Sequence, residues 1–157
     1  MDMDQLYDYR ARLLDRLESI PDEIAQAARV VTPEKIHRPT QSDKMSPHQI
    51  IARLRNMEKH AYSARLQKII AEESPSMETF PIERWEAEHY APSESIESIL
   101  NEYITIRHTE LNLLRALSPH DWNRSGRHNT FGLRTVQWWA ERSLEYATIQ
   151  LRELRNA

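Results

Sequence analysis

Apolar residues recur at steps of three and four in four long segments of this chain, and this spacing constrains the fold more than any other feature. In the first segment the repeat runs from Met3 to Ile20, and Pro21 is expected to interrupt it before a second helical piece over 21–31. The other three segments cover residues 47–73, 96–117 and 136–154. Each repeat is typical of a helix with one apolar face. Four such helices bury their faces most simply against one another, which predicts an all-α fold, a four-helix bundle.

The residues at the predicted helix starts support these boundaries. Typical N-cap residues precede the later segments. Ser46, with Pro47 after it, precedes the second segment, Ser93 or Ser95 precedes the third, and Thr135 precedes the fourth. The chain has only two glycines, Gly126 and Gly132, and both lie in the polar stretch between the third and fourth helices. The rest of the chain is therefore free of the residue that weakens helices most after proline.

A long connection separates the second helix from the third. Residues 75–92 contain three prolines together with Phe80, Trp85 and Tyr90, so we expect a crossover with at most a short helical turn. Glu86 and His89, like Glu34 and His37, match the Glu-x-x-His step of di-iron bundles. Both matches are expected to lie in connections, where the helical projection that such a site needs is missing.

Composition excludes several classes of protein. A chain of 157 residues with 39% apolar content is the size of one domain, over 1–157, with one core. The absence of cysteine excludes disulfides, thiolate nucleophiles and cysteine metal ligands. A net charge of -3 argues against a nucleic-acid partner, and no run of 18 apolar residues indicates a membrane span. A cytoplasmic location is the default expectation.

The order of certain residues along the chain resembles a known family. They are Ser46-Pro47-His48, Ile50-Ile51-Ala52, Glu58, Arg65-Leu66, Trp85, Arg107, Leu113-Leu114 with Leu117, Ser118-Pro119-His120-Asp121-Trp122, Gly126, His128, Gly132 and Thr135. In this order and spacing they resemble the DinB/YfiT-like superfamily across nearly the whole chain. The resemblance implies a four-helix bundle of that type, with the long crossover between its second and third helices.

The resemblance also implies a divalent metal, held by one histidine on the second helix and an HxxxH pair on the fourth. The matching positions in this sequence are occupied by Arg53, Tyr146 and Gln150. A guanidinium has no lone pair to donate, and its charge about 4 Å from a divalent ion would repel that ion by roughly 8 kcal/mol at an effective dielectric near 20. We therefore expect no metal and no other cofactor at this position.

Several polar residues are expected to face the interior of the bundle. Gln150 is predicted on the apolar face of the fourth helix, with Tyr146 on its flank, and Arg107 and Glu110 are one helical turn apart on the third helix. With Arg53 they predict either a pocket for a small anionic or amide ligand, or a closed internal network. We expect the closed network, in which loss of Arg107 or Glu110 leaves a buried partner unpaired.

Trp138 and Ile149 are predicted on the side of the fourth helix opposite its main apolar stripe. A homodimer interface would cover these large apolar groups, although another part of the same chain could cover them instead.

Three functions remain open from the sequence. The first is a non-catalytic or small-ligand-binding bundle without the family's metal. The second is a thiol-dependent transferase or metal-dependent hydrolase whose site is displaced, and the third is a homodimeric structural or interaction protein.

Overall fold

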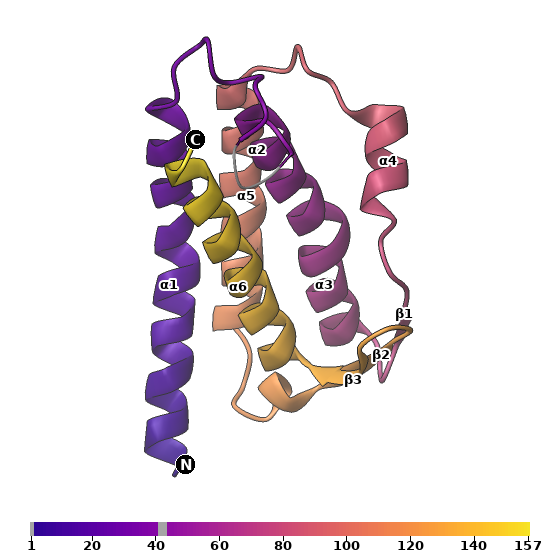
Figure 1. Cartoon of the computed structure of the whole chain (residues 1–157). Coiled ribbons are helices and arrows are strands. Elements are labelled where there is room, and N and C mark those ends of the chain that lie inside the picture. The colour runs from indigo at the N-terminus through magenta and orange to yellow at the C-terminus, as the bar shows by residue number, and fades with distance from the viewer. Residues whose placement is uncertain (1, 41–43) are drawn as a thin grey trace.

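The computed structural model describes residues 2–40 and 44–157, and four long helical rods form a bundle in it (Figure 1). The rods are α1 (Met3–Arg29), α2 (Pro47–Met57) continued by η1 (Glu58–Tyr62) and α3 (Ser63–Ala71), α5 (Ile96–Arg115), and α6 (Val136–Arg155). Their N-caps Ser46, Ser95 and Thr135 each accept a hydrogen bond from the first turn of the helix that follows. The predicted all-α four-helix bundle is confirmed.

Helix α1 runs without a break through Pro21, so the predicted interruption there was wrong. Proline lacks the N–H that would bond the carbonyl four residues earlier, and that carbonyl belongs to Leu17. Arg107 of α5 donates to the Leu17 carbonyl oxygen at 2.9 Å and replaces the missing donor. The helix therefore continues because a neighbouring helix satisfies the group that proline leaves free.

The second rod contains a π-helical turn, η1, between α2 and α3. The sequence predicted one regular helix over 47–73 and gave no sign of this turn. A π turn accommodates one extra residue in a helix and is frequently found at functional sites. Here it carries Glu58 and Tyr62, and both side chains are buried.

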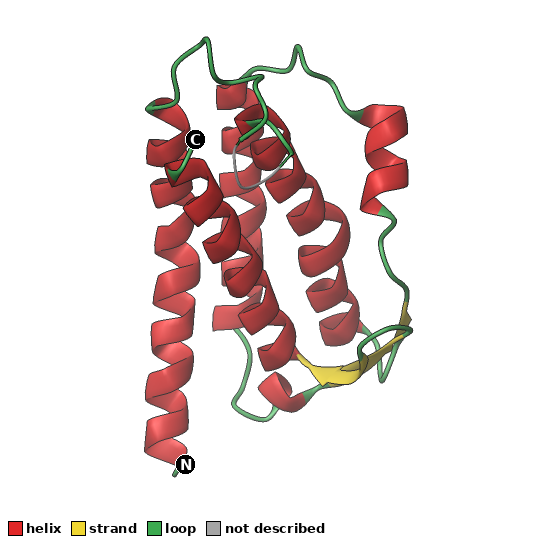
Figure 2. Ribbon diagram, viewed as in Figure 1, coloured by secondary structure: helices red, strands yellow, loops and turns green. Residues whose placement is uncertain are grey.

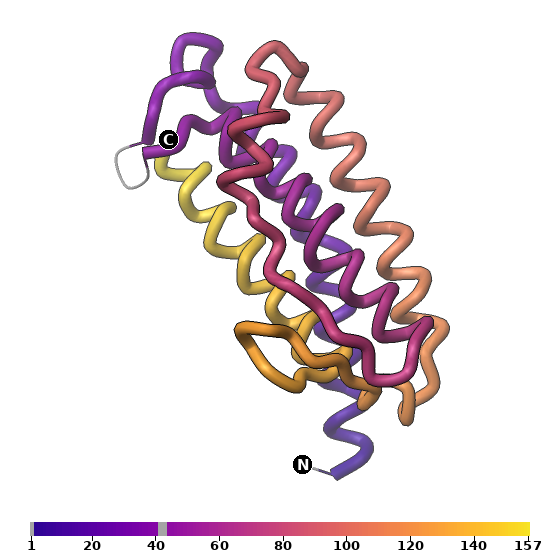
Figure 3. Tube along the Cα trace, turned by 90° about the vertical axis from the view of Figure 1, so that its right-hand side faces the viewer, coloured from indigo at the N-terminus to yellow at the C-terminus, as the bar shows by residue number. Residues whose placement is uncertain are grey.

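The crossover contains a two-turn helix, α4 (Ile82–His89), which is longer than the short turn predicted. The Glu86–His89 step therefore lies on a helix and not in an irregular connection. Figure 3 shows the crossover running across the face of the bundle to which α2 and α3 belong. Contacts between α2 and α4 hold it there.

Three short strands close one end of the bundle, where the sequence predicted only a polar loop (Figure 2). They are β1 (Ser76–Met77), β2 (Ser125–His128) and β3 (Gly132–Thr135). A 3₁₀ turn, η2 (Asp121–Asn123), comes directly before β2. Strand β2 lies in the middle, parallel to β1 and antiparallel to β3.

Both glycines serve this sheet. A Cβ atom at Gly126 would lie 2.9 Å from the Met77 side chain and 3.2 Å from the Pro75 carbonyl oxygen, so β1 can approach β2 only at a glycine. Gly132 has a φ of +75°, which suits the turn between β2 and β3.

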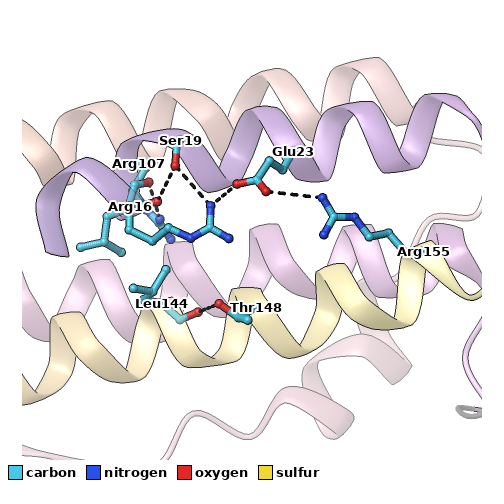
Figure 4. A network of polar contacts seen from close by, with 8 residues as sticks. Arg16, Ser19, Glu23, Arg107, Leu144, Thr148 and Arg155 are labelled. Atoms are coloured by element: carbon cyan, nitrogen blue, oxygen red, sulfur yellow. Dashed lines mark hydrogen bonds and ion pairs between the residues drawn. The ribbon is translucent and has the colours of Figure 1, made fainter. Parts of the chain in front are cut away.

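The core is mostly apolar, with a few buried polar side chains, and ion pairs lie on the outside of the bundle. The largest fully buried apolar side chains come from all four rods: Leu17, Ile20, Ile24, Ile50, Ile51, Leu54, Leu66, Ile69, Ile99, Tyr103 and Trp139. On the outside, Glu23 of α1 lies between Arg16 of the same helix and Arg155 of α6 (Figure 4). None of the helices in 2–40 and 44–157 is long and apolar enough to cross a membrane.

Candidate functional site: a buried ionic network and the Arg53–Glu86 ion pair

Arg107 lies at the centre of a polar network inside the bundle, and its side chain is fully buried. Besides the Leu17 carbonyl, its guanidinium donates to the Ser143 hydroxyl at 3.1 Å and lies 3.4 Å from a carboxylate oxygen of Glu58. Ser143 in turn donates to the same Glu58 oxygen at 2.8 Å. The network therefore joins all four rods, through α1, η1, α5 and α6.

Glu110 brings a second carboxyl group into this network and is 1% exposed. Its Oε1 lies 3.8 Å from Nε of Arg107, which is too far for a hydrogen bond. Neither Glu110 oxygen accepts a hydrogen bond from a described residue, and one Glu58 oxygen also has no donor. Burial, and then the adjacent carboxylate of Glu58, raise the pKa of Glu110 well above its usual range.

Charge balance favours a proton on Glu110. Two carboxylates and one guanidinium would leave an uncompensated negative charge in the core, which is strongly unfavourable. The raised pKa of Glu110 favours its protonated form, which removes that charge.

Arg53, which the sequence resemblance matches to a metal ligand of the family, is paired with the crossover. Its Nε donates to a carboxylate oxygen of Glu86 at 3.0 Å, and a terminal nitrogen donates to the other oxygen. Both groups are largely shielded, because the side chain of Arg53 is 25% exposed and that of Glu86 16%. The two-point contact fixes α4 against α2.

The other two residues that the resemblance matches to metal ligands, Tyr146 and Gln150, lie on α6. Tyr146 packs its ring 5.7 Å from the ring of Tyr62, and burial raises the pKa of its phenol although the charge of Arg53 opposes this. The phenol therefore keeps its proton at neutral pH. Gln150 is partly buried, between the buried Ala147 and Leu151, and its placement on the inner face of α6 stays a prediction.

These three residues do not fit a divalent metal. The Arg53 guanidinium has no lone pair and is engaged by Glu86, a protonated phenol is a weak ligand, and an amide oxygen alone does not make a site. Across residues 2–40 and 44–157, no group of three or more His, Asp or Glu side chains is placed to hold a metal ion.

The structure separates the five predicted pocket residues. Arg107 and Glu110 lie together in the core network, and Arg53 and Tyr146 lie near Glu86 of the crossover. Gln150 is partly buried on α6. Sequence reasoning missed Glu58, Ser143 and Glu86 as partners. Ser143 did carry a signal, because it is a polar residue on the apolar stripe of the fourth helix.

The two apolar residues of the predicted dimer face have different surroundings. Trp138 is half-buried beneath the strand hairpin, with Phe131 at 5.6 Å between ring centroids and the guanidinium of Arg134 4.5 Å from its ring. Ile149 is 44% exposed and lines a groove between α1 and α6 with Leu13. The homodimer remains a prediction, and Ile149 is its more exposed element.

Comparisons with known proteins agree with this architecture. The family model of the DinB superfamily matches residues 5–145. Among solved structures, the chain is similar to YfiT from Bacillus subtilis, described as a probable metal-dependent hydrolase with an unusual four-helix bundle topology. The TM-score is 0.77 at 18% identity, over 97% of this chain and 89% of that one, a likeness that concerns the fold. No curated protein matches the sequence. Since the family model spans most of its length, the chain belongs to the DinB superfamily.

Proposed function

We propose that this chain is a metal-free member of the DinB superfamily, which binds a small ligand and does not catalyse a metal-dependent reaction. The observation that carries the proposal is the ion pair between Arg53 and Glu86. The resemblance matches Arg53 to the first metal ligand of the family, so a cation stands where a ligand is expected. Glu86, a nearby carboxylate, is held by that cation. The crossover then covers the place from which a substrate would approach a metal there.

The alternative of a displaced metal site has less support. Glu86 and His89 are one helical turn apart on α4, but the ring of His89 stacks on Trp85 at 4.7 Å and Glu86 is paired with Arg53. A metal would have to break both contacts to use this pair. Thiol-dependent or hydrolytic chemistry that depends on a metal is therefore the less favoured function.

Metal analysis tests the proposal directly. We expect the purified protein to contain far less than one zinc, nickel, iron or manganese per chain. The matched control is the variant in which Arg53, Tyr146 and Gln150 are all replaced by histidine, which should gain about one nickel or zinc per chain because imidazole supplies the missing lone pairs. A wild-type protein with one metal per chain, lost on Arg53→Ala or Gln150→Ala, would overturn the proposal.

A second candidate function is assembly through the groove between α1 and α6, because Ile149 is exposed there beside Leu13 and Leu144. We expect the wild-type protein to form a homodimer and the Ile149→Asp variant to be monomeric, since a charge in an apolar contact is costly. Light scattering over a range of concentrations measures this. A wild-type mass of 18.6 kDa at the highest concentration would remove the candidate.

A further inference from the structure

Arg65 of α3 is a buried arginine that stacks on aromatic rings. It is 8% exposed, and its guanidinium carbon Cζ lies 4.7 Å from the ring centroid of Trp139 and 5.9 Å from that of Tyr62. It has no hydrogen bond and no ion pair with any residue in 2–40 and 44–157. Buried arginines are normally paired, because an uncompensated charge in a low dielectric is costly. Arg65 has no carboxylate partner among the described residues.

Two further N–H donors beside Arg65 also lack acceptors. Nδ1 of His128 accepts the backbone N–H groups of Thr130 at 3.0 Å and Phe131 at 3.2 Å, so the proton of the neutral ring is on Nε2. That Nε2 is buried and has no partner in the described part of the chain, and the same holds for the indole Nε1 of Trp139. The two rings lie 5.4 Å apart.

These donors come from three separate elements, namely α3, β2 and α6. The charge of Arg65, after burial itself, lowers the pKa of His128, which places the guanidinium and the imidazole in each other's field. Burial also lowers the pKa of Arg65, and no carboxylate offsets that effect. Arg142 lies over the rings of Phe131 and Trp138 in the same aromatic cluster, but it is paired with Glu145 at 3.5 Å.

We propose that Arg65, His128 and Trp139 form a binding site for a small oxyanion, either a carboxylate or a phosphate group. An oxyanion carries several lone pairs and can accept from all three donors at once, while its charge compensates the guanidinium. The site lies at the end of the bundle closed by the strands, away from Arg53 and Glu86. It names a ligand class for the binding role proposed above, and in that sense rests on it.

Anion titrations followed by NMR test this site. Wild-type protein is titrated with sodium phosphate in one series and sodium acetate in another, at constant ionic strength with chloride as the balancing ion. We expect saturable binding of one of them, with a downfield shift of the Trp139 indole N–H resonance as it gains an acceptor. The preferred series identifies the ligand as a phosphate or a carboxylate.

The variants separate a built site from a general positive field. Arg65→Met should weaken binding at least tenfold, whereas Arg142→Met, which removes an arginine stacked on the same aromatic cluster, should leave it within about twofold. If Arg65→Met does not fold, Arg65→Lys keeps the charge without the planar fork and should still weaken binding severalfold.

Two results would overturn the inference. One is the absence of saturable binding of either anion by the wild type, and the other is an equal response in the wild type and the Arg65 variant, which means an adventitious ion only. Neither result depends on metal content, so this site and the metal-free proposal can fail separately.

Discussion

Replacement of Arg107 by methionine is expected to lower the free energy of unfolding by about 3 to 5 kcal/mol, because it leaves buried partners uncompensated. Glu58 loses the guanidinium that lies 3.4 Å away, and the Leu17 carbonyl loses the donor that substitutes for the N–H missing at Pro21. Methionine can fill much of the volume but satisfies neither group. Urea denaturation followed by circular dichroism measures the loss.

Arg115→Met is the matched control, on the same helix α5. Arg115 pairs with Glu18, but both side chains are about half exposed, so its loss should cost under about 1 kcal/mol. A loss under about 1 kcal/mol in Arg107→Met as well would mean that water reaches the network. The interior would then be a wet cavity and not a closed ionic core.

The contribution of Glu110 to stability is expected to fall as the pH rises above about 4.5, the usual pKa of a glutamate, so the wild-type protein should lose stability relative to the Glu110→Gln variant over this range. The pKa of Glu110 is raised in the folded protein, so between its unfolded and folded values the native state binds more protons than the unfolded state. The stabilisation that protonated Glu110 contributes is fully present below its pKa in the unfolded chain. It is lost as the pH rises through its pKa in the folded protein. The slope can reach about 1.4 kcal/mol per pH unit.

Urea denaturation at a series of pH values measures this slope in both proteins. Glutamine resembles the protonated carboxyl in shape and in having a donor, so Glu110→Gln should remain folded at neutral pH, and it should be the more stable of the two at high pH. Sequence reasoning treated Glu110 as the partner of Arg107, in which case its loss would be costly. Parallel pH profiles for wild type and variant would show that Glu110 does not hold the proton.

The helices could be predicted because their signals are local. Apolar spacing and the caps Ser46 and Thr135 depend on residues a few positions apart, and the structure confirms them. The path of α1 through Pro21 could not be predicted in the same way. It depends on Arg107, which is 90 positions away from Leu17 in the sequence.

The site was predictable only in part, for the same reason. The placement of Arg107 and Glu110 in the interior followed from the helical spacing on α5. The partners that decide their charge state, Glu58 and Ser143, lie on other rods, and the pairing of Arg53 depends on the path of the crossover. Strand β1 has two residues and no sequence signal, because only its pairing with β2 makes it a strand.

That pairing fixes an order of events in folding. Ser76 lies opposite Arg127, so about 50 residues of chain, including all of α5, must be arranged before β1 and β2 can meet. Two-residue strands cannot form ahead of the helices that position them. We therefore expect the sheet to close late in folding, after the helices that bring its strands together.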